Sequence, residues 1–498
     1  MTQTTFRTGA FVPTPNENIS VAYGLVKTVE YYLGSVGILD YADTLKERGV
    51  PMSRILVAMC THVLMGSNSM SRCSGWLKDR NVRKELGLDA GLSQRTINRG
   101  LAILGDHSDQ IIVKLWEGLN TRYRFESTDV NIDGSAVVMN GPESKLGAVG
   151  YPRDFRDQSR PQVEFLAAEL QGSRIPFFIR AYEGNASDPA QYRDALPDIF
   201  SMVRQGSWII MNNGGASGDI LDSVVRSGNQ YLTRVKLNVS DEKRAKQASK
   251  SWQYIEDGVC CLSHRFESSG RTTYLYWSLD NWMRSYKAAE RSVDRMIRAM
   301  TTYESGKLRK SDFVTVKRNV LADVQVTVSQ QRKLEFTAEE REGLIREVMG
   351  PRAGLFKLES SVQLTPAEAL DKYRARTTVE HLIHSLKRVT GIKPLRVWNE
   401  SSIRGSMLLA LLSEIAIALA RYEMKGVRKT VTERGRRRTS VEKPCTESIV
   451  WSLSHLTVTR IVERGIRKKA VFSNWDPISE EIFANIGAKG PSWGPIVA

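Results

Sequence analysis

Apolar residues recur every three or four positions over the first quarter of the chain, which predicts helices rather than strands. The pattern is clear in residues 26–33 and 55–64. Residues 92–104 follow it too, with Ser93 placed to be an N-cap. The polar face of this segment consists of Gln94, Arg95, Asn98 and Arg99. It is similar to the second half of a DNA-binding helix-turn-helix, and a plain helical bundle explains the pattern equally well. We expect residues 1–125 to form a helical domain.

After this region the apolar positions alternate or run continuously, which predicts buried strands. The first strand covers residues 128–139 and carries Asp133 in its middle. Residues 163–170 and 175–182 form a further pair of apolar strands around a short turn. A carboxylate inside a buried strand is costly unless it is paired or binds a cation, so Asp133 is a candidate functional residue.

Another buried strand, residues 207–211, leads directly into Asn212 and a glycine-rich turn. With the preceding strands it predicts the first part of an α/β core, residues 126–217. Residues 218–365 combine short strand-like runs with a basic helical stretch, which indicates a β-rich insertion. Three tryptophans of this insertion lie among basic residues, where they either pack or stack on bases: Trp252, Trp277 and Trp282.

Four reactive side chains share one stripe of a helix predicted over residues 373–387. At about 100° per residue they fall within roughly 60° of one another. These residues are Tyr373, Arg376, Glu380 and Lys387. An ordinary solvated face with i,i+4 pairs gives the same pattern. The functional interpretation is a phenol, a guanidinium and an ammonium that bind phosphate beside a metal-binding carboxylate.

The end of the chain changes from apolar to basic. Residues 407–420 are strongly apolar but too short and interrupted to span a membrane, and they belong to a second part of the core, residues 366–424. A basic linker then opens the last region, residues 425–498, and we expect it to be flexible and to lie on phosphate. It includes Arg436, Arg437 and Arg438. The remainder regains apolar periodicity, so it could dock on the body, on a second subunit or on DNA.

Composition narrows the class of partner. The chain has 498 residues, with 71 Lys and Arg against 55 Asp and Glu, a net charge of +16 and a pI near 9.6. Such an excess favours a polyanion, either nucleic acid or an anionic membrane surface. The five cysteines form no C-x-x-C pair, so we predict neither disulfides nor structural zinc. No long apolar run and no signal peptide are visible, which leads us to expect a cytoplasmic protein without a membrane partner.

Three positions could form one site: Asp133, Asn212 and Glu380. Carboxylates that converge on one point suit a pair of Mg²⁺ ions about 3.5–4 Å apart. Such a pair activates a water or a 3′-hydroxyl and stabilises the leaving oxygen of a phosphodiester. Arg376 and Lys387 would then hold flanking phosphates, and Tyr373 would donate a hydrogen bond.

The spacing of Tyr373, Arg376, Glu380 and Lys387 resembles the YREK signature of DDE transposases of the insertion-sequence-four family of bacteria and archaea. The residue types and the intervals match completely. The strand around Asp133, the turn at residues 184–188 and the Arg404-Gly405 pair support the resemblance, which covers roughly residues 128–420. The helical region before it is similar to that family's end-recognition domain.

The resemblance implies an RNase H-like catalytic core interrupted by the β-rich insertion. Asp133 would be its first acidic residue and Glu380 its third. It also implies a cut-and-paste transposase that uses two Mg²⁺ or Mn²⁺ ions per active site, binds terminal inverted repeats and target DNA, and acts as a homodimer in a synaptic complex on the DNA of a prokaryotic nucleoid. In such relatives an insertion tryptophan can stabilise a flipped base.

The departure from the family pattern is Asn212, which stands where the second acidic residue should be. An amide is a neutral oxygen ligand, so the metal site loses a charge. We therefore expect this chain to bind DNA but to cleave it poorly. A deliberate Asp→Asn change that traps a DNA complex explains the intact remainder of the signature best, and natural decay is the alternative. Asp219 could substitute, although its position beyond the glycine-rich turn is more typical of a solvated helix residue.

Two other functions remain compatible with these residues. One is a domesticated DNA-binding protein that keeps the fold and has lost catalysis. The other is a stand-alone endonuclease of the same fold, which would cut without paired ends.

Overall fold

The computed structural model describes residues 21–140, 144–150, 160–248, 251–265, 270–304, 337–433, 436–463 and 466–488. The chain divides into two compact units. The first comprises residues 1–210, 217–229 and 375–498, and the second comprises residues 211–216 and 230–374. Both helices and strands occur in each unit, which makes the protein a mixed α/β protein.

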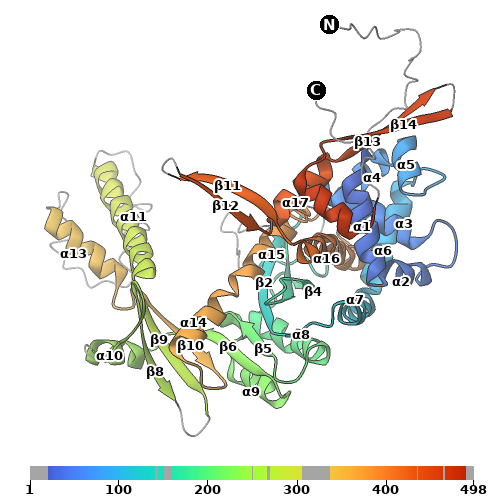
Figure 1. Cartoon of the computed structure of the whole chain (residues 1–498). Helices are drawn as coiled ribbons and strands as arrows, with labels where there is room; N and C mark the ends of the chain where they lie inside the picture. Colours follow the sequence, from blue (N-terminus) through green and yellow to red (C-terminus); the bar gives the residue numbers. More distant parts are fainter. Residues whose placement is uncertain are drawn as a thin grey trace, which may run out of the picture. The chain divides into compact units, whose positions relative to one another are not determined.

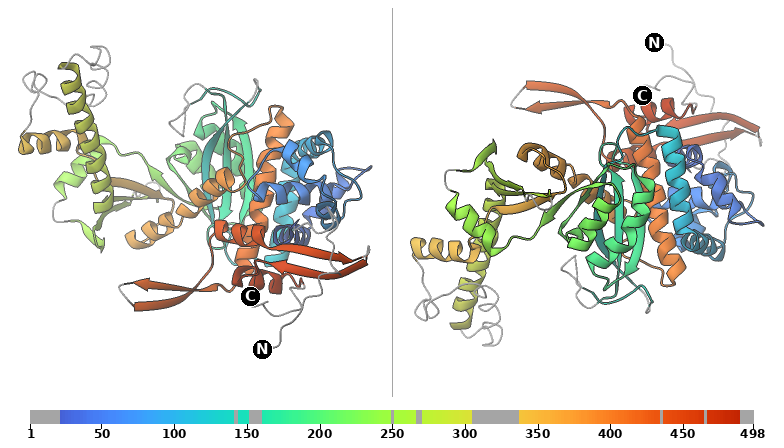
Figure 2. Two further views of the ribbon diagram at one scale, coloured as in Figure 1. Left: turned by 90° about the horizontal axis from the view of Figure 1, so that it is seen from above. Right: turned by 90° about the horizontal axis from the view of Figure 1, so that it is seen from below.

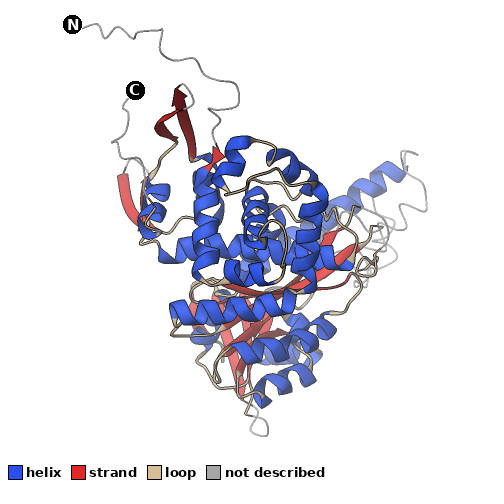
Figure 3. Ribbon diagram, turned by 90° about the vertical axis from the view of Figure 1, so that its right-hand side faces the viewer, coloured by secondary structure: helices blue, strands red, loops and turns tan. Residues whose placement is uncertain are grey.

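Helices dominate the N-terminal part of the first unit, as the periodicity predicts (Figure 3). They are α1 (Tyr23–Ser35), α2 (Ile38–Thr44), α3 (Met52–Leu64), α4 (Met70–Trp76), α5 (Arg80–Glu85), α6 (Gln94–Asp106) and α7 (Ser108–Tyr123). The predicted N-cap of α6 is confirmed, because the Ser93 hydroxyl accepts a hydrogen bond from the Thr96 amide.

Four strands of the first unit follow the order β4-β3-β2-β5. They are β2 (Val130–Val138), β3 (Gln162–Leu170), β4 (Pro176–Glu183) and β5 (Trp208–Met211). Pairing is antiparallel between β2 and β3 and between β3 and β4, whereas β2 and β5 run parallel. Helices α8 (Asp188–Met202) and α9 (Gly218–Arg226) complete this region. The strands that alternation predicted are all present.

The longest described helix of this unit is α16 (Glu400–Glu423), which extends the predicted apolar segment at both ends. It packs beside α6, α1 and α3 (Figure 1). By length and composition α16 could cross a membrane, but 89% of its apolar window is buried inside the protein, as in the core helix of a globular domain.

Glycines allow α6 and α16 to pack backbone against backbone. A Cβ on Gly105 of α6 would lie 1.7 Å from the Ser401 carbonyl oxygen, and a Cβ on Gly405 of α16 would lie 2.0 Å from the Leu101 carbonyl oxygen. Only glycine, which has no Cβ, fits at either position. The N-terminal helices and the apolar helix therefore share one core.

The C-terminal region is more regular than the sequence predicts. The prediction of a flexible linker is wrong for the described part of this region. Strands β11 (Val427–Glu433) and β12 (Arg436–Glu442) form an antiparallel hairpin there. Arg436, Arg437 and Arg438 lie on β12, and the Thr and Val residues of the two strands, most of them on β11, favour the extended state over a coil. The side chains of these three arginines lie outside the described part of the chain.

The last elements dock on the body of the first unit, and contact of this region with a second subunit or with DNA stays a prediction. They are α17 (Thr446–His455), β13 (Thr457–Glu463), β14 (Ile466–Ser473) and α18 (Pro477–Asn485). Strand β13 pairs with β1 (Val21–Ala22), and α17 packs on α1. The first described strand of the chain thus pairs with a strand of its C-terminal region.

The second unit is built on an antiparallel sheet in the order β6-β10-β9-β8-β7. Its elements are η1 (Asn213–Gly215), β6 (Gln230–Val235), α10 (Val239–Gln247), β7 (Gln253–Glu256), β8 (Val259–Arg265), β9 (Thr272–Ser278), α11 (Leu279–Glu304), α13 (Ala338–Met349), β10 (Leu355–Ser360) and α14 (Pro366–Arg374). Helices α11 and α13 pack side by side (Figure 2). A buried ion pair joins Lys357 of β10 to Asp241 of α10 over 2.6 Å. The second unit overlaps the insertion that we expected at residues 218–365, but α9 belongs to the first unit.

We predict that Gly405→Ala destabilises the protein by about 1–3 kcal/mol or more, because the added methyl forces α16 away from the α6 backbone. The check is the melting temperature. Gly75→Ala is the matched control, since a Cβ at Gly75 in α4 meets nothing within 4 Å and alanine gains ~1 kcal/mol of helix propensity. An unchanged melting temperature in Gly405→Ala would contradict the shared core.

Candidate active site

The stretch predicted as one helix is two helices, so the prediction of a single stripe is wrong. Helix α14 ends at Arg374, and α15 (Thr377–Arg388) begins after a turn at Ala375 and Arg376. Tyr373 consequently lies on α14 in the second unit, and the other three signature residues lie in the first unit. The aliphatic side chains of α15 from Val379 to Leu386 are buried, so this helix docks on the core through an apolar face.

Side chains that compete for the Ala375 carbonyl cause this break. The carbonyl accepts hydrogen bonds from the Thr378 hydroxyl at 3.0 Å and from the Asn131 amide of β2 at 3.3 Å. Such side-chain bonds offer the backbone an alternative to the helical ladder. The turn is therefore tied to the sheet, and it fixes the direction from which Arg376 leaves the backbone.

A buried carboxyl completes the polar network below the turn. Glu169 of β3 accepts hydrogen bonds from Asn131 at 3.3 Å and from the Thr378 hydroxyl. Burial raises the pKa of Glu169 to about 7, although the two hydrogen bonds act in the opposite direction and lower this pKa. Sequence reasoning missed all three residues, although a polar residue inside an apolar strand is the signal that singled out Asp133.

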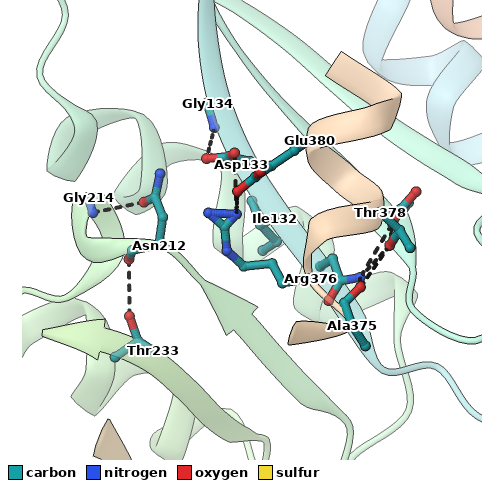
Figure 4. Close-up of polar contacts among 12 residues, drawn as sticks. Ile132, Asp133, Gly134, Asn212, Gly214, Thr233, Ala375, Arg376, Thr378 and Glu380 are labelled. Atoms are coloured by element: carbon teal, nitrogen blue, oxygen red, sulfur yellow. Dashed lines mark hydrogen bonds and ion pairs between the residues drawn. The ribbon is translucent and has the colours of Figure 1, made fainter. Parts of the chain in front are cut away.

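The structure brings together Asp133, Arg376 and Glu380 (Figure 4). One guanidinium nitrogen of Arg376 lies 3.4 Å from Asp133 Oδ2 and 3.3 Å from Glu380 Oε1. The side chains of Arg376 and Asp133 are 8% and 12% exposed, whereas that of Glu380 is 58% exposed. The other Asp133 oxygen, Oδ1, accepts the Gly134 amide at 3.0 Å.

This arrangement changes the interpretation of Arg376. A buried carboxylate needs a charged partner, and the guanidinium supplies one to Asp133 while reaching the more exposed Glu380. Arg376 therefore links two acidic residues from distant segments before any ligand binds. Its predicted contact with phosphate would require the guanidinium to leave this position, and that role stays a prediction.

Asn212 belongs to the second unit, directly after β5. Its Oδ1 accepts a hydrogen bond from the Gly214 amide at 2.8 Å, and its carbonyl accepts one from the Thr233 hydroxyl at 3.0 Å (Figure 4). The residue is half-buried and caps the short helix η1. An Asp in the same place could accept the same amide, so the local fold does not require the amide side chain.

Asp219, the possible substitute, forms an exposed ion pair with Arg193 at 2.5 Å. The hydrogen bond from Arg193 is the main cause that lowers the pKa of Asp219 to about 2. Its exposure of 53% matches the solvated helix residue that we expected.

The remaining candidates are distributed over both units. Lys387 is half-buried on α15 and lines a cavity with other basic residues. The exposed residues of α6, namely Gln94, Arg95, Asn98 and Arg99, line a neighbouring cavity. In the second unit Trp252 and Trp277 pack on the cluster around Leu275, and Trp282 stacks on Tyr286. All three insertion tryptophans are half-buried beside these neighbours, and base stacking by one of them stays a prediction.

Comparison with known proteins supports one family. The family described as Transposase DDE domain matches residues 132–413, more than half of the chain. No curated protein matches the chain. Among solved structures, the piggyBac transposase in a synaptic complex with hairpin DNA is similar at 10% identity and a TM-score of 0.41. That similarity covers 89% of this chain and 81% of the other, and it is too distant to support an argument about the site.

We predict that Glu169→Gln weakens the fall of stability with rising pH. The pKa of Glu169 is raised from 4.5 to about 7 in the fold, so the native state keeps a proton that the unfolded chain has lost. The stability from this group is complete below the unfolded pKa and is lost as pH rises through the folded one. Melting temperatures at about pH 5 and about pH 8 measure the difference. Glu126→Gln is the exposed control and should behave as the unchanged chain; an unaltered pH dependence in Glu169→Gln would contradict the burial of this carboxyl.

Proposed function

The chain belongs to the Transposase DDE domain family, and we propose that it is a cut-and-paste DNA transposase of the insertion-sequence-four type, with a metal site that lacks one charge. Members of the family generally use divalent metal ions for phosphodiester chemistry. The observation that carries the proposal is the guanidinium shared by Asp133 and Glu380, because Arg376 and Asp133 lie 243 residues apart in the sequence.

Strand register supports the assignment of Asn212 to the second acidic position. Strands β2 and β5 run parallel, with Asn131 opposite Ile210. Asp133 follows Asn131 by two residues on β2, and Asn212 follows Ile210 by two residues, directly after the end of β5. This equal spacing from a paired position is what the assignment of Asp133 and Asn212 as the first two acidic positions of an RNase H-like core requires.

The donor chemistry fits a divalent cation. Asp133, Asn212 and Glu380 offer hard oxygen ligands of the kind that Mg²⁺ and Mn²⁺ prefer. The described part of the chain contains no group of three or more His, Cys, Asp and Glu side chains that could hold a metal ion. Bound at Asp133, Asn212 and Glu380, two ions supply activation of the attacking oxygen and charge stabilisation at the leaving oxygen.

The protein's own residues would prepare the site for this chemistry. Arg376 holds Glu380 toward Asp133, and the turn at Ala375 keeps Arg376 in place. Lys387 and Tyr373 complete the signature and would contact phosphates of the bound DNA. Net charge of +16 favours such binding through release of counterions.

We infer the remaining partners from the same assignment. The substrates would be the terminal inverted repeats of the element and a target DNA, brought together by a homodimer in the cytoplasm of a prokaryotic cell. Gln94, Arg95, Asn98 and Arg99 on α6 would take part in recognition of the ends, and the arginines of β12 would contact phosphates.

Asn212 itself favours a second candidate function. A domesticated protein that binds DNA and no longer cuts it would keep Arg376 and the α6 surface and could lose the carboxylate. This candidate would be excluded if the gene lies within an intact transposable element and the Asn212→Asp protein cleaves DNA.

We predict that Asn212→Asp restores Mg²⁺-dependent cleavage of a duplex that carries the end of its own element. One added carboxylate provides the charge that two dications need, and removal of a ligand or of its second shell typically changes affinity or activity about 10–100-fold or more. The measurement is single-turnover cleavage on a sequencing gel.

Two variants make this result specific. Glu380→Gln in the Asn212→Asp background should return cleavage to the level of the original chain, whereas Asp219→Asn in that background should leave it unchanged. Cleavage that depends on Asp219, or a reverted protein that stays inert, would show that position 212 is not the second acidic position.

A further inference from the structure

Two adjoining cavities of the first unit form one groove, which we call the α6–α16 groove. Their volumes are about 530 Å³ and 660 Å³. They share Asn68, Ser69 and Arg396 as lining residues, so they are continuous. The groove runs from the end of α15 to the N-terminal ends of α6 and α16.

Positive charge gathers in the first cavity. Five basic residues line it: Arg72, Lys387, Arg388, Lys393 and Arg396. Neither cavity has an aspartate or glutamate among its lining residues, all of which belong to the described part of the chain. A concave surface with one sign of charge concentrates counterions of the opposite sign. The natural occupant is a chain of phosphates.

The second cavity adds hydrogen-bonding groups and an aromatic ring. The polar residues of α6 line it together with Trp398. Trp398 is 53% exposed, which is unusual for so large an apolar side chain. Basic residues that follow a backbone, beside an exposed aromatic ring, are the combination that binds unpaired nucleotides.

The walls of the groove are fixed by the fold. Asn68 donates a hydrogen bond to the Pro394 carbonyl at 3.3 Å, which ties the loop after α3 to the loop before α16. Asn399 caps α16 through the Ser402 amide at 2.7 Å. The N-termini of α6 and α16 both open on the second cavity, and helix N-termini favour anionic groups. The site is therefore preorganised.

We propose that the α6–α16 groove binds a DNA strand through Arg72, Lys393 and Arg396 and stacks one unpaired base on Trp398. This proposal rests on the proposed function, since a transposase must hold DNA ends. It assigns the stacking ring to the first unit, where the insertion tryptophans do not lie. The competing outcome is that a fully paired duplex contacts only the basic residues of the groove and no base stacks on Trp398.

The test measures binding of the full-length chain to two DNA probes without metal ions. One probe is a short duplex of arbitrary sequence with a single unpaired 2-aminopurine, and the other is the fully paired duplex. We expect tighter binding of the unpaired probe, together with quenching of 2-aminopurine fluorescence. Trp398→Ala should weaken binding of the unpaired probe by about tenfold and abolish the quenching, and Trp398→Phe should retain most of both.

The role of the basic residues is tested by the affinity for both probes and by its dependence on salt. Arg72→Ala and Arg396→Ala should weaken binding of both probes and each reduce the slope of log affinity against log salt by about 0.7–0.9. The matched controls are Arg48→Ala, which removes an exposed charge outside the groove, and Trp451→Ala, which removes a tryptophan that is 62% exposed on α17. Both should bind as the unchanged chain does.

Equal affinity for the two probes, or a Trp398→Ala protein that still quenches, would overturn the stacking role. Losses in Arg72→Ala and Arg396→Ala no larger than in Arg48→Ala would overturn the groove. These failures are separate from failure of the proposed function. Cleavage by Asn212→Asp tests the function without reference to Trp398, and binding without metal tests the groove without reference to cleavage.

Discussion

The ion pairs of Arg376 are the interaction on which the candidate active site depends. Asp133 is nearly buried on a central strand, and a carboxylate there is unfavourable without a partner. The guanidinium meets that need and at the same time contacts Glu380, which has ample access to water. The side chain of Arg376 thereby joins two acidic residues that are far apart in the sequence, one on β2 and one on α15. Removal of the guanidinium would take this charged partner away from Asp133, so Arg376 serves both the fold and the site.

The position of Arg376 depends in turn on the polar residues beneath it. Asn131 and Thr378 take the Ala375 carbonyl out of the helical ladder, and Glu169 accepts hydrogen bonds from both. Glu414, which is buried on α16 and accepts a hydrogen bond from Ser385 of α15 at 2.6 Å, anchors the helix further along. Burial raises the pKa of Glu414 to about 7. A layer of buried polar groups thus couples β2, β3, α15 and α16, and each group in it is costly to leave without a partner.

Local patterns predicted the elements well and their junctions poorly. The period of apolar residues predicted the N-terminal helices and the four strands, because these features depend on spacing within a short window. The break at Ala375 depends on Asn131, which lies far away in the sequence, so helical spacing alone could not reveal it. The hairpin of β11 and β12 was missed because positive charge is typical of a linker, while the Thr and Val residues of the two strands were the stronger signal. Residue type and spacing were enough to single out Asp133 and Glu380 as candidate site residues, whereas the pairing role of Arg376 required the structure.

The central claim is that position 212 decides whether the site between Asp133 and Glu380 holds two divalent ions. The most direct measurement is the number of Mn²⁺ ions bound per chain, followed by electron paramagnetic resonance and displaced by Mg²⁺. We expect the Asn212→Asp variant to bind about two ions per chain, as a two-metal site does, and the chain with Asn212 to bind fewer and more weakly. Equal numbers and affinities in both proteins would contradict the account.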